Sequence, residues 1–354
     1  MCCEISKDGL RFWRIRDIYP SSMAAESKQS VSPEFVLRTF GLGKRFRTRW
    51  AVNNLDLQVQ RGDVFGFLGP NGAGKSTTIR MMLSLVRPTT GSVELFGKSL
   101  HQHRSFCLSR VGGLVERADF YLYLSARRNL EIVGSCLGGV DRKAIDQVLD
   151  IVGLADRADD KVKTYSHGMK QRLGIAQALL GSPELVVLDE PTSGLDPQGI
   201  KEVRDLIKRL SADHRMTVFL SSHLLSEIEQ TATSMAIIND GTLIVQGRVR
   251  DLLATTTGVV WIDAHPRDQA LRLLRQQAMV SDAREEGEGL VVTVRPEQVA
   301  AVNRILVDAG IEVRALAPKR SLEEYFLMLT GGASEISPRG ARRSRNSAAP
   351  TPSV

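Results

Sequence analysis

The sequence is organised around nine residues that follow a short apolar run: Gly69-Pro70-Asn71-Gly72-Ala73-Gly74-Lys75-Ser76-Thr77. The apolar run Val64–Leu68 predicts a strand, and the residues from Lys75 onward predict a helix. The glycines of the loop between them permit backbone conformations that a Cβ disfavours, so successive N–H groups can turn toward one phosphate. The start of the helix adds the positive end of its dipole. The stretch therefore predicts a phosphate-binding loop.

The last residues of this loop suit a nucleoside triphosphate and its metal ion. Lys75 can reach β- and γ-phosphates, and the Ser76 hydroxyl can bind Mg²⁺. The pattern Gly-x-x-x-x-Gly-Lys-Ser is specific when a strand precedes it and a helix follows. An ordinary glycine turn before a helix is the alternative.

The composition is that of a globular protein with little net charge outside its C-terminal end. The 354 residues suggest about two domains, and no stretch approaches the roughly 18 consecutive apolar residues of a membrane span. The net charge is +7; four arginines and one glutamate between 335 and 345 contribute 4 − 1 = +3, which leaves 7 − 3 = +4 elsewhere. Nucleic acid is therefore not expected as a partner, because it needs basic residues clustered on one face.

The cysteines and the N-terminal residues indicate a cytosolic protein. The four cysteines have no zinc-site or disulfide spacing, and residues 1–30 lack the apolar core of a secretory signal. Residues 1–34 are predicted to be a disordered extension, and Met23 is an alternative start. Residues 332–354 are predicted to be a disordered basic tail.

Two folded parts are expected between these ends. Residues 35–250 predict an α/β domain in which about 105–180 form a helical insertion, and the helix after the phosphate loop is expected to end at Pro88. Residues 251–331 predict a small α+β domain. Its strand-helix-strand-strand-helix-strand order is ferredoxin-like, with a last helix at 321–329.

Two further apolar runs of the first domain end in reactive side chains. The run Leu185–Leu188 ends at Asp189 and Glu190, and the run that starts at Thr217 ends at Ser222 and His223. Continuous apolar runs are typical of parallel strands buried on both faces, and ligands of such sheets collect at the carboxyl ends of the strands. If these strands neighbour the strand of the phosphate loop, all three motifs meet at one edge.

The residue types at this edge suggest separate roles. Asp189 can hold Mg²⁺ through water, Glu190 can polarise the attacking water, and His223 can sense the γ-phosphate. The alternatives are two exposed acids in a turn and a histidine with a purely structural role.

Three further motifs carry a resemblance to a known family. They are Tyr165-Ser166-His167-Gly168-Met169-Lys170-Gln171-Arg172-Leu173, Pro191-Thr192-Ser193-Gly194-Leu195-Asp196 and Ser221-Ser222-His223. Over about 35–250 the chain resembles the ATP-binding subunit of an ABC transporter, which implies a P-loop nucleoside triphosphatase core with a helical subdomain, and ATP with Mg²⁺ as ligands.

The resemblance also implies a head-to-tail homodimer. In the family, a signature loop, here Tyr165 to Met169, contacts the γ-phosphate bound to the other subunit, which assigns that contact to Ser166 and Gly168. Residues 193–196 resemble the loop that crosses the dimer interface. Phe46, which lies 75 − 46 = 29 residues before Lys75, stands where the family stacks adenine on an aromatic ring. Trp50 is the rival candidate, and both could be packing residues.

The chain departs from the family pattern at a metal-site position and in the signature loop. Glu116 stands where the family has a glutamine near the metal, and a carboxylate there can bind Mg²⁺ or hold water. His167 and Met169 replace a glycine and a glutamine of the signature. With these features the chain resembles ATPases of bacterial drug, bacitracin or lantibiotic exporters.

Membership of this branch implies a membrane partner and a place beside the membrane. The expected partner is a separate integral membrane permease, with this chain peripheral on the inner face of the cell membrane. Phe120, Tyr121 and Tyr123 form either a local core or the surface that grips the permease. A non-transport ABC ATPase and a regulatory module without turnover are the alternative functions.

Overall fold

The computed structural model describes residues 34–116, 118–255 and 259–318. Apart from Glu34, the predicted N-terminal extension lies outside the described residues. So do the predicted last helix at 321–329 and the basic tail.

A six-stranded sheet forms the centre of the larger part. Its strands follow the order β11 (Thr242–Arg248), β10 (Ser234–Asn239), β4 (Val64–Leu68), β9 (Thr217–Ser222), β8 (Leu185–Leu188) and β7 (Val111–Leu114). Neighbouring strands are parallel, except for the antiparallel pair β10–β11. Every residue of β4, β8 and β9 is buried, which explains why these strands read as continuous apolar runs.

An antiparallel sheet and two helices cover the first face of this centre. The sheet contains β1 (Phe35–Phe46), β2 (Arg49–Leu55), β3 (Gln58–Gln60), β5 (Thr90–Leu95) and β6 (Lys98–Ser99), and the helices are α1 (Lys75–Met82) and α2 (Arg104–Leu108). Their buried side chains pack with Phe65 and Phe67 of β4, whose rings both lie 5.5 Å from that of Phe219.

The prediction that the first helix ends at Pro88 is wrong, because α1 ends at Met82. The N–H groups of Leu85 and Val86 both bond to the carbonyl of Arg80, and Ser84 has a φ of +56°. The chain therefore closes the helix with its own backbone before the proline is reached.

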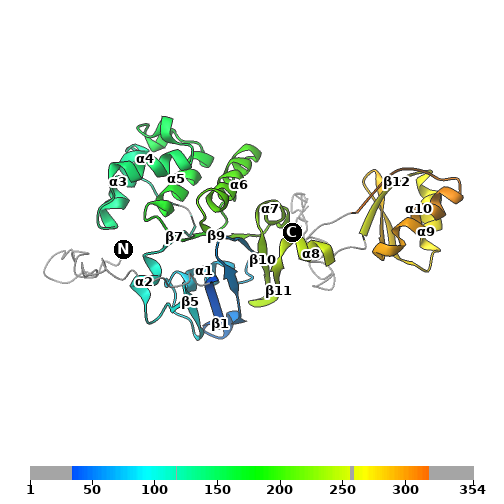
Figure 1. The fold of residues 1–354 in the computed structure, drawn as a ribbon, viewed down its shortest axis with the longest axis horizontal. Coiled ribbons are helices and arrows are strands. Elements are labelled where there is room, and N and C mark those ends of the chain that lie inside the picture. Colours follow the sequence, from blue (N-terminus) through cyan, green and yellow to red (C-terminus); the bar gives the residue numbers. More distant parts are fainter. Residues whose placement is uncertain (1–33, 117, 256–258, 319–354) are drawn as a thin grey trace, which may run out of the picture.

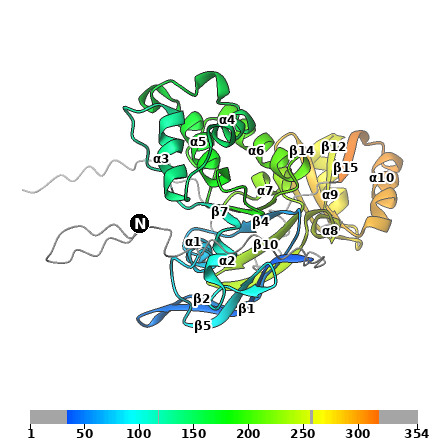
Figure 2. The same cartoon turned by 60° about the vertical axis from the view of Figure 1, so that its left-hand side comes forward.

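The remaining helices of this part lie on the opposite face or extend from it. They are α3 (Ala126–Cys136), α4 (Arg142–Ile151), α5 (His167–Leu179), α6 (Pro197–Ala212), α7 (Leu225–Thr231) and α8 (Val249–Thr255). Figures 1 and 2 both show α3, α4 and α5 gathered as one group, away from β1 and β5. Ser125 and Asp141 accept hydrogen bonds at the starts of α3 and α4, which confirms the helices expected there.

The C-terminal part forms a separate group of strands and helices at the right of Figure 1. It has its own apolar core. It contains β12 (Val259–His265), α9 (Arg267–Arg275), β13 (Val280–Glu286), β14 (Gly289–Val294), α10 (Val299–Asp308) and β15 (Glu312–Pro318). The antiparallel sheet has the order β13-β14-β12-β15, so the predicted ferredoxin-like arrangement is confirmed. None of the helices in the described parts of the chain combines the length and apolar character that crossing a bilayer requires.

Candidate functional site

The three predicted motifs meet at one edge of the central sheet. Strands β4, β9 and β8 are direct neighbours, and their register pairs Leu68 with Ser222 and Leu188 with Leu220. The phosphate loop, the pair Asp189-Glu190 and the pair Ser222-His223 therefore leave the sheet side by side, as the sequence predicts.

The phosphate loop is held by close contacts between backbones. Gly74, the residue that caps α1, has a φ of +107°, and a Cβ added to it would lie 2.4 Å from the carbonyl oxygen of Ala51 in β2. A Cβ added to Gly69 would lie 2.3 Å from the carbonyl oxygen of Ile238 in β10. Side chains at these positions would displace the loop, which explains its glycines.

Lys75 is folded into this loop. Its side chain is only 5% exposed, and its Nζ donates to the carbonyl oxygens of Gly69 (2.7 Å) and Pro70 (3.3 Å). The loop thus places an ammonium group and the N-terminus of α1 at one spot, which is an arrangement suited to phosphate.

One buried hydroxyl links the two acids that follow β8. Ser221 Oγ donates to Asp189 Oδ1 (2.6 Å) and accepts from the Glu190 N–H (2.9 Å). Asp189 is 6% exposed, and Glu190 has a φ of +47°. No role was predicted for Ser221 from the sequence. A hydroxyl directly after the apolar residues Val218, Phe219 and Leu220 of a buried strand was the available signal.

The Glu190 carboxylate lies between two nitrogen-bearing side chains. Its Oε1 is 3.4 Å from Lys75 Nζ, and its Oε2 is 3.1 Å from His223 Nδ1. A carboxylate that faces both the ammonium group of the predicted phosphate loop and an imidazole has a position suited to general-base chemistry.

A cavity of about 290 Å³ opens beside the phosphate loop. It is lined by four predicted site residues, Ser76, Glu116, Asp189 and Glu190, and by His167, Gln171 and Ser193. Mg²⁺ keeps several waters and needs few protein oxygens. The Ser76 hydroxyl and the Asp189 carboxylate, which line the same cavity, fit that requirement. Gln171 was not predicted as part of this site, because it belongs to the motif that the family resemblance assigns to the site of the other subunit.

Glu116 follows β7 and lies at the rim of this cavity. Its backbone has a φ of +63°, and its carboxylate forms an ion pair with Arg80 of α1. The carboxylate expected at this position is therefore beside the predicted metal ligands, but it is partnered by a cation.

Ser166 and Gly168 lie at the start of α5. Ser166 caps the helix by accepting a hydrogen bond from the Met169 N–H (3.2 Å), and its side chain is exposed. Gly168 is buried, and a Cβ added to it would lie 3.6 Å from the Cα of Gly199 in α6. Ser166 and Gly168 do not line the cavity beside the phosphate loop of their own chain.

The two aromatic candidates for base stacking lie in the β1–β2 hairpin. The ladder pairs Phe46 with Arg49 and Arg45 with Trp50, so the two rings point to opposite faces. Trp50 covers Gly43, where an added Cβ would lie 3.1 Å from the ring. Phe46 is 50% exposed, so it has the freer ring of the two.

The aromatic segment after β7 divides between core and surface. Phe120 packs against the buried cluster under α3 and α5. Tyr121 and Tyr123 are 52% and 67% exposed, with ring centroids 6.1 Å apart. The local-core interpretation is therefore right for Phe120 and wrong for the two tyrosines.

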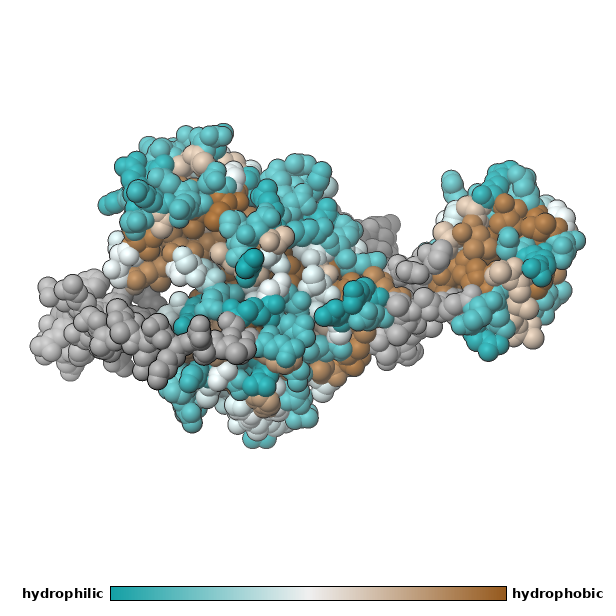
Figure 3. All heavy atoms as spheres, in the orientation of Figure 1, coloured by the Kyte–Doolittle hydropathy of each residue, from teal (hydrophilic) through white to brown (hydrophobic). Residues whose placement is uncertain are grey.

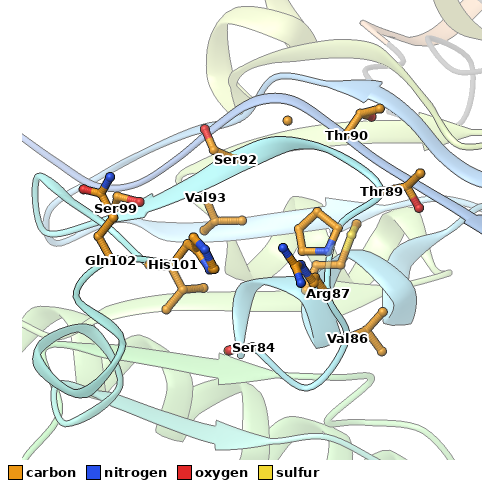
Figure 4. A pocket seen from close by; sticks show the side chains of 14 residues that line it. Ser84, Val86, Arg87, Thr89, Thr90, Ser92, Val93, Ser99, His101 and Gln102 are labelled. Atoms are coloured by element: carbon orange, nitrogen blue, oxygen red, sulfur yellow. The ribbon is translucent and has the colours of Figure 1, made fainter.

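A larger cavity lies away from these residues. Figure 4 shows this space of about 520 Å³ between the end of α1 and strands β5 and β6, with Arg87 and His101 beside it. It contains no residue predicted for the site, so volume alone does not locate the chemistry.

Comparisons with known proteins agree with this geometry. Residues 52–193 match the ABC transporter family. The chain is 41% identical over 299 residues to the bacitracin transport ATP-binding protein BcrA of Bacillus licheniformis, which covers 84% of this chain and 98% of that protein. It is 38% identical over 299 residues to the daunorubicin resistance ATP-binding protein DrrA3 of Streptomyces coeruleorubidus, with 82% and 94% covered.

The fold is also that of a solved cassette. A dimeric post-hydrolysis structure of the ATP-binding cassette MJ0796, bound to ADP and Pi, matches with a TM-score of 0.54 at 23% identity, over 60% of this chain and 99% of that one. The fold, the phosphate loop and these relatives agree: the chain belongs to the ATP-binding proteins of ABC transporters.

Proposed function

We propose that two copies of this chain bind MgATP between them and hydrolyse it to drive export through a separate membrane subunit. The observation that carries the proposal is the position of Glu190. Its carboxylate contacts both Lys75, which lies in the phosphate loop, and His223 at the end of β9. A phosphate cradle, a base and an imidazole at one sheet edge are the parts that phosphoryl transfer to water requires.

Six of the predicted site residues take defined roles in this reaction. Lys75 and the N–H groups of the loop hold the phosphates, and Phe46 stacks on the base. Ser76 and Asp189 would hold Mg²⁺, which supplies charge neutralisation when bound. Glu190 accepts a proton from the attacking water, and His223 orients the γ-phosphate.

The position of the signature loop supports the proposed dimer. Ser166 presents an exposed hydroxyl at the N-terminus of a 13-residue helix, outside the cavity of its own phosphate loop. A helix N-terminus with a hydroxyl is an anion site. In a head-to-tail pair, Ser166 and Gly168 of each copy would complete the other copy's site. The solved dimer of MJ0796 shows that a cassette of this fold can pair.

Mixing two inactive variants tests this arrangement. Lys75→Ala removes a phosphate contact, and Ser166→Arg blocks the signature loop. In a head-to-tail mixed dimer one site carries both defects and the other carries neither. We expect each variant alone to lack phosphate release and the mixture to recover a substantial part of it. A mixture as inactive as its components would contradict a head-to-tail pair in which one complete site is enough for hydrolysis.

The same assay decides between the enzyme and a regulatory module. Wild-type protein that binds ATP but releases no phosphate, alone or with its membrane partner, would favour the module. A non-transport ATPase would fail to retain any integral membrane protein.

The exposed tyrosines mark the surface that we propose for the permease. Tyr121, Leu122 and Tyr123 are 52%, 49% and 67% exposed, although backbone hydrogen bonds hold the segment, including Lys163 N–H to the Leu122 carbonyl (2.9 Å). Figure 3 also shows apolar residues gathered along the lower border of the helical subdomain. Exposed aromatics on a firmly held segment are typical of protein interfaces.

A double variant of these tyrosines tests the surface. We expect wild-type protein to carry an integral membrane protein with it when purified from solubilised native membranes. Tyr121→Asp with Tyr123→Asp should lose most of this partner, because two charges would be buried in the interface. The melting temperature is the control for folding, and undiminished retention would exclude this surface.

The cargo and the location follow from the relatives. Because the names of BcrA and DrrA3 refer to bacitracin transport and daunorubicin resistance, we propose an antibiotic-like or drug-like cargo. The chain would act peripherally on the cytoplasmic face of the membrane. We also propose the division into an ATPase domain at 35–250 and an accessory domain at 251–331.

A further inference from the structure

The cavity beside the phosphate loop contains an excess of carboxylates. Glu116, Asp189 and Glu190 all line it, together with Ser76 of α1. The proposed ligand adds the negative charge of a triphosphate. Each carboxylate therefore needs a partner if it is not to oppose binding. Asp189 accepts the Ser221 hydroxyl, and Glu190 faces Lys75, which leaves Glu116 as the carboxylate to be explained.

Arg80 is the partner of Glu116, and the fold places it there. Ser76 and Arg80 are four residues apart in α1, so they lie on one face of the helix, one turn apart. The β7–β8 register pairs Leu114 with Leu188, which brings Glu116 to the level of Glu190. As a result, the Nη2 atom of Arg80 forms an ion pair with Oε1 of Glu116, which connects α1 to the end of β7.

The backbone of Glu116 supports a specific placement. Its φ of +63° is a conformation that residues with a Cβ adopt at some cost. The cost is tolerated where surrounding contacts define the position. The Arg80 ion pair is one such contact for a side chain that is otherwise 66% exposed.

We propose that Arg80 is a positioning residue that neutralises Glu116 and fixes its carboxylate, so that the acid does not repel the triphosphate. This inference rests on the proposed binding of ATP. With a glutamine at position 116, Arg80 would not have this role, because a neutral amide requires no counter-charge.

Salt dependence separates this role from a structural one. We expect Arg80→Gln to weaken binding of a fluorescent ATP analogue about tenfold at about 0.02 M NaCl, because an uncompensated charge then faces the phosphates. The loss should shrink to about twofold near 0.5 M NaCl, where exposed charges are screened. In phosphate release, KM should rise while kcat changes little. Arg87→Gln, an exposed arginine on the loop after α1, controls for net charge.

A second background makes the test decisive. The double variant Glu116→Gln with Arg80→Gln should differ in nucleotide affinity from the single variant Glu116→Gln by less than about twofold. An equal loss in both backgrounds, or a loss that salt does not reduce, would overturn the proposal and leave Arg80 a structural residue of α1. Melting temperatures report folding of each variant. Wild-type protein that bound no nucleotide would instead refute the proposed function itself.

Discussion

Glu190→Gln protein is expected to hydrolyse ATP about 10²- to 10⁴-fold more slowly than wild type while its affinity for ATP changes only a few-fold. The amide cannot accept the proton that the attacking water must lose. It nearly preserves the size of the carboxylate, so Lys75 and the phosphate loop keep their places. Phosphate release measures the first effect, and equilibrium titration with a fluorescent ATP analogue measures the second.

A control variant with the same substitution elsewhere tests whether slow hydrolysis is specific to position 190. Glu229→Gln, on α7, removes a carboxylate that lines neither the cavity beside the phosphate loop nor the neighbouring cavity around Ser222 and His223. It should hydrolyse ATP at nearly the wild-type rate. If Glu190→Gln did the same, Glu190 would not be the base, and a water-positioning role would have to pass to another residue.

Lys75→Ala is expected to weaken ATP binding about 10²- to 10³-fold. Hydrogen bonds to charged groups are typically worth about 1.5–3 kcal/mol each, and Lys75 can make more than one to a triphosphate. Its side chain is 5% exposed, so in the Lys75→Ala variant bulk water cannot readily replace the hydrogen bonds of the lost ammonium group. Binding measured by titration, rather than hydrolysis, is the appropriate readout.

Two checks accompany this variant. Lys161→Ala removes an exposed lysine and should bind ATP normally. Because Lys75 also donates to the Gly69 and Pro70 carbonyls, the melting temperature of Lys75→Ala must be compared with wild type. A folded Lys75→Ala protein with unchanged affinity would contradict the assignment of the phosphate loop.

The parts of the site that the sequence predicted are those carried by contiguous residues. A phosphate loop between a strand and a helix has a local pattern, and so do two apolar runs that end in Asp189-Glu190 and Ser222-His223. Buried parallel strands must be neighbours in some order, and chemistry gathers at their carboxyl ends. Their meeting at one edge was predicted on the condition that these strands are neighbours, and the order β4-β9-β8 meets that condition.

The remaining contacts join residues that the sequence does not associate. Ser221 bonds to Asp189 across 32 positions, and Arg80 pairs with Glu116 across 36. No periodicity connects such residues, because strand register and the distance of α1 from β7 decide the contact. The choice between Phe46 and Trp50 likewise depended on which face of a hairpin each ring occupies.

The early end of α1 has a similar origin. Because proline cannot continue a helix, Pro88 set only an upper limit on the residue at which the helix ends. The backbone bonds from Leu85 and Val86 to Arg80 ended the helix six residues sooner.

The contact of Gly74 with Ala51 has a consequence for the working cycle. Gly241 also lies against Ala51, where an added Cβ would come within 2.9 Å, and its N–H donates to the Ala73 carbonyl. The phosphate loop is thus held between strand β2 and the turn that joins β10 to β11, and these contacts restrict changes in its shape. In the proposed homodimer, we therefore expect the release of ADP to depend on separation of the two protomers more than on a change in the shape of this loop.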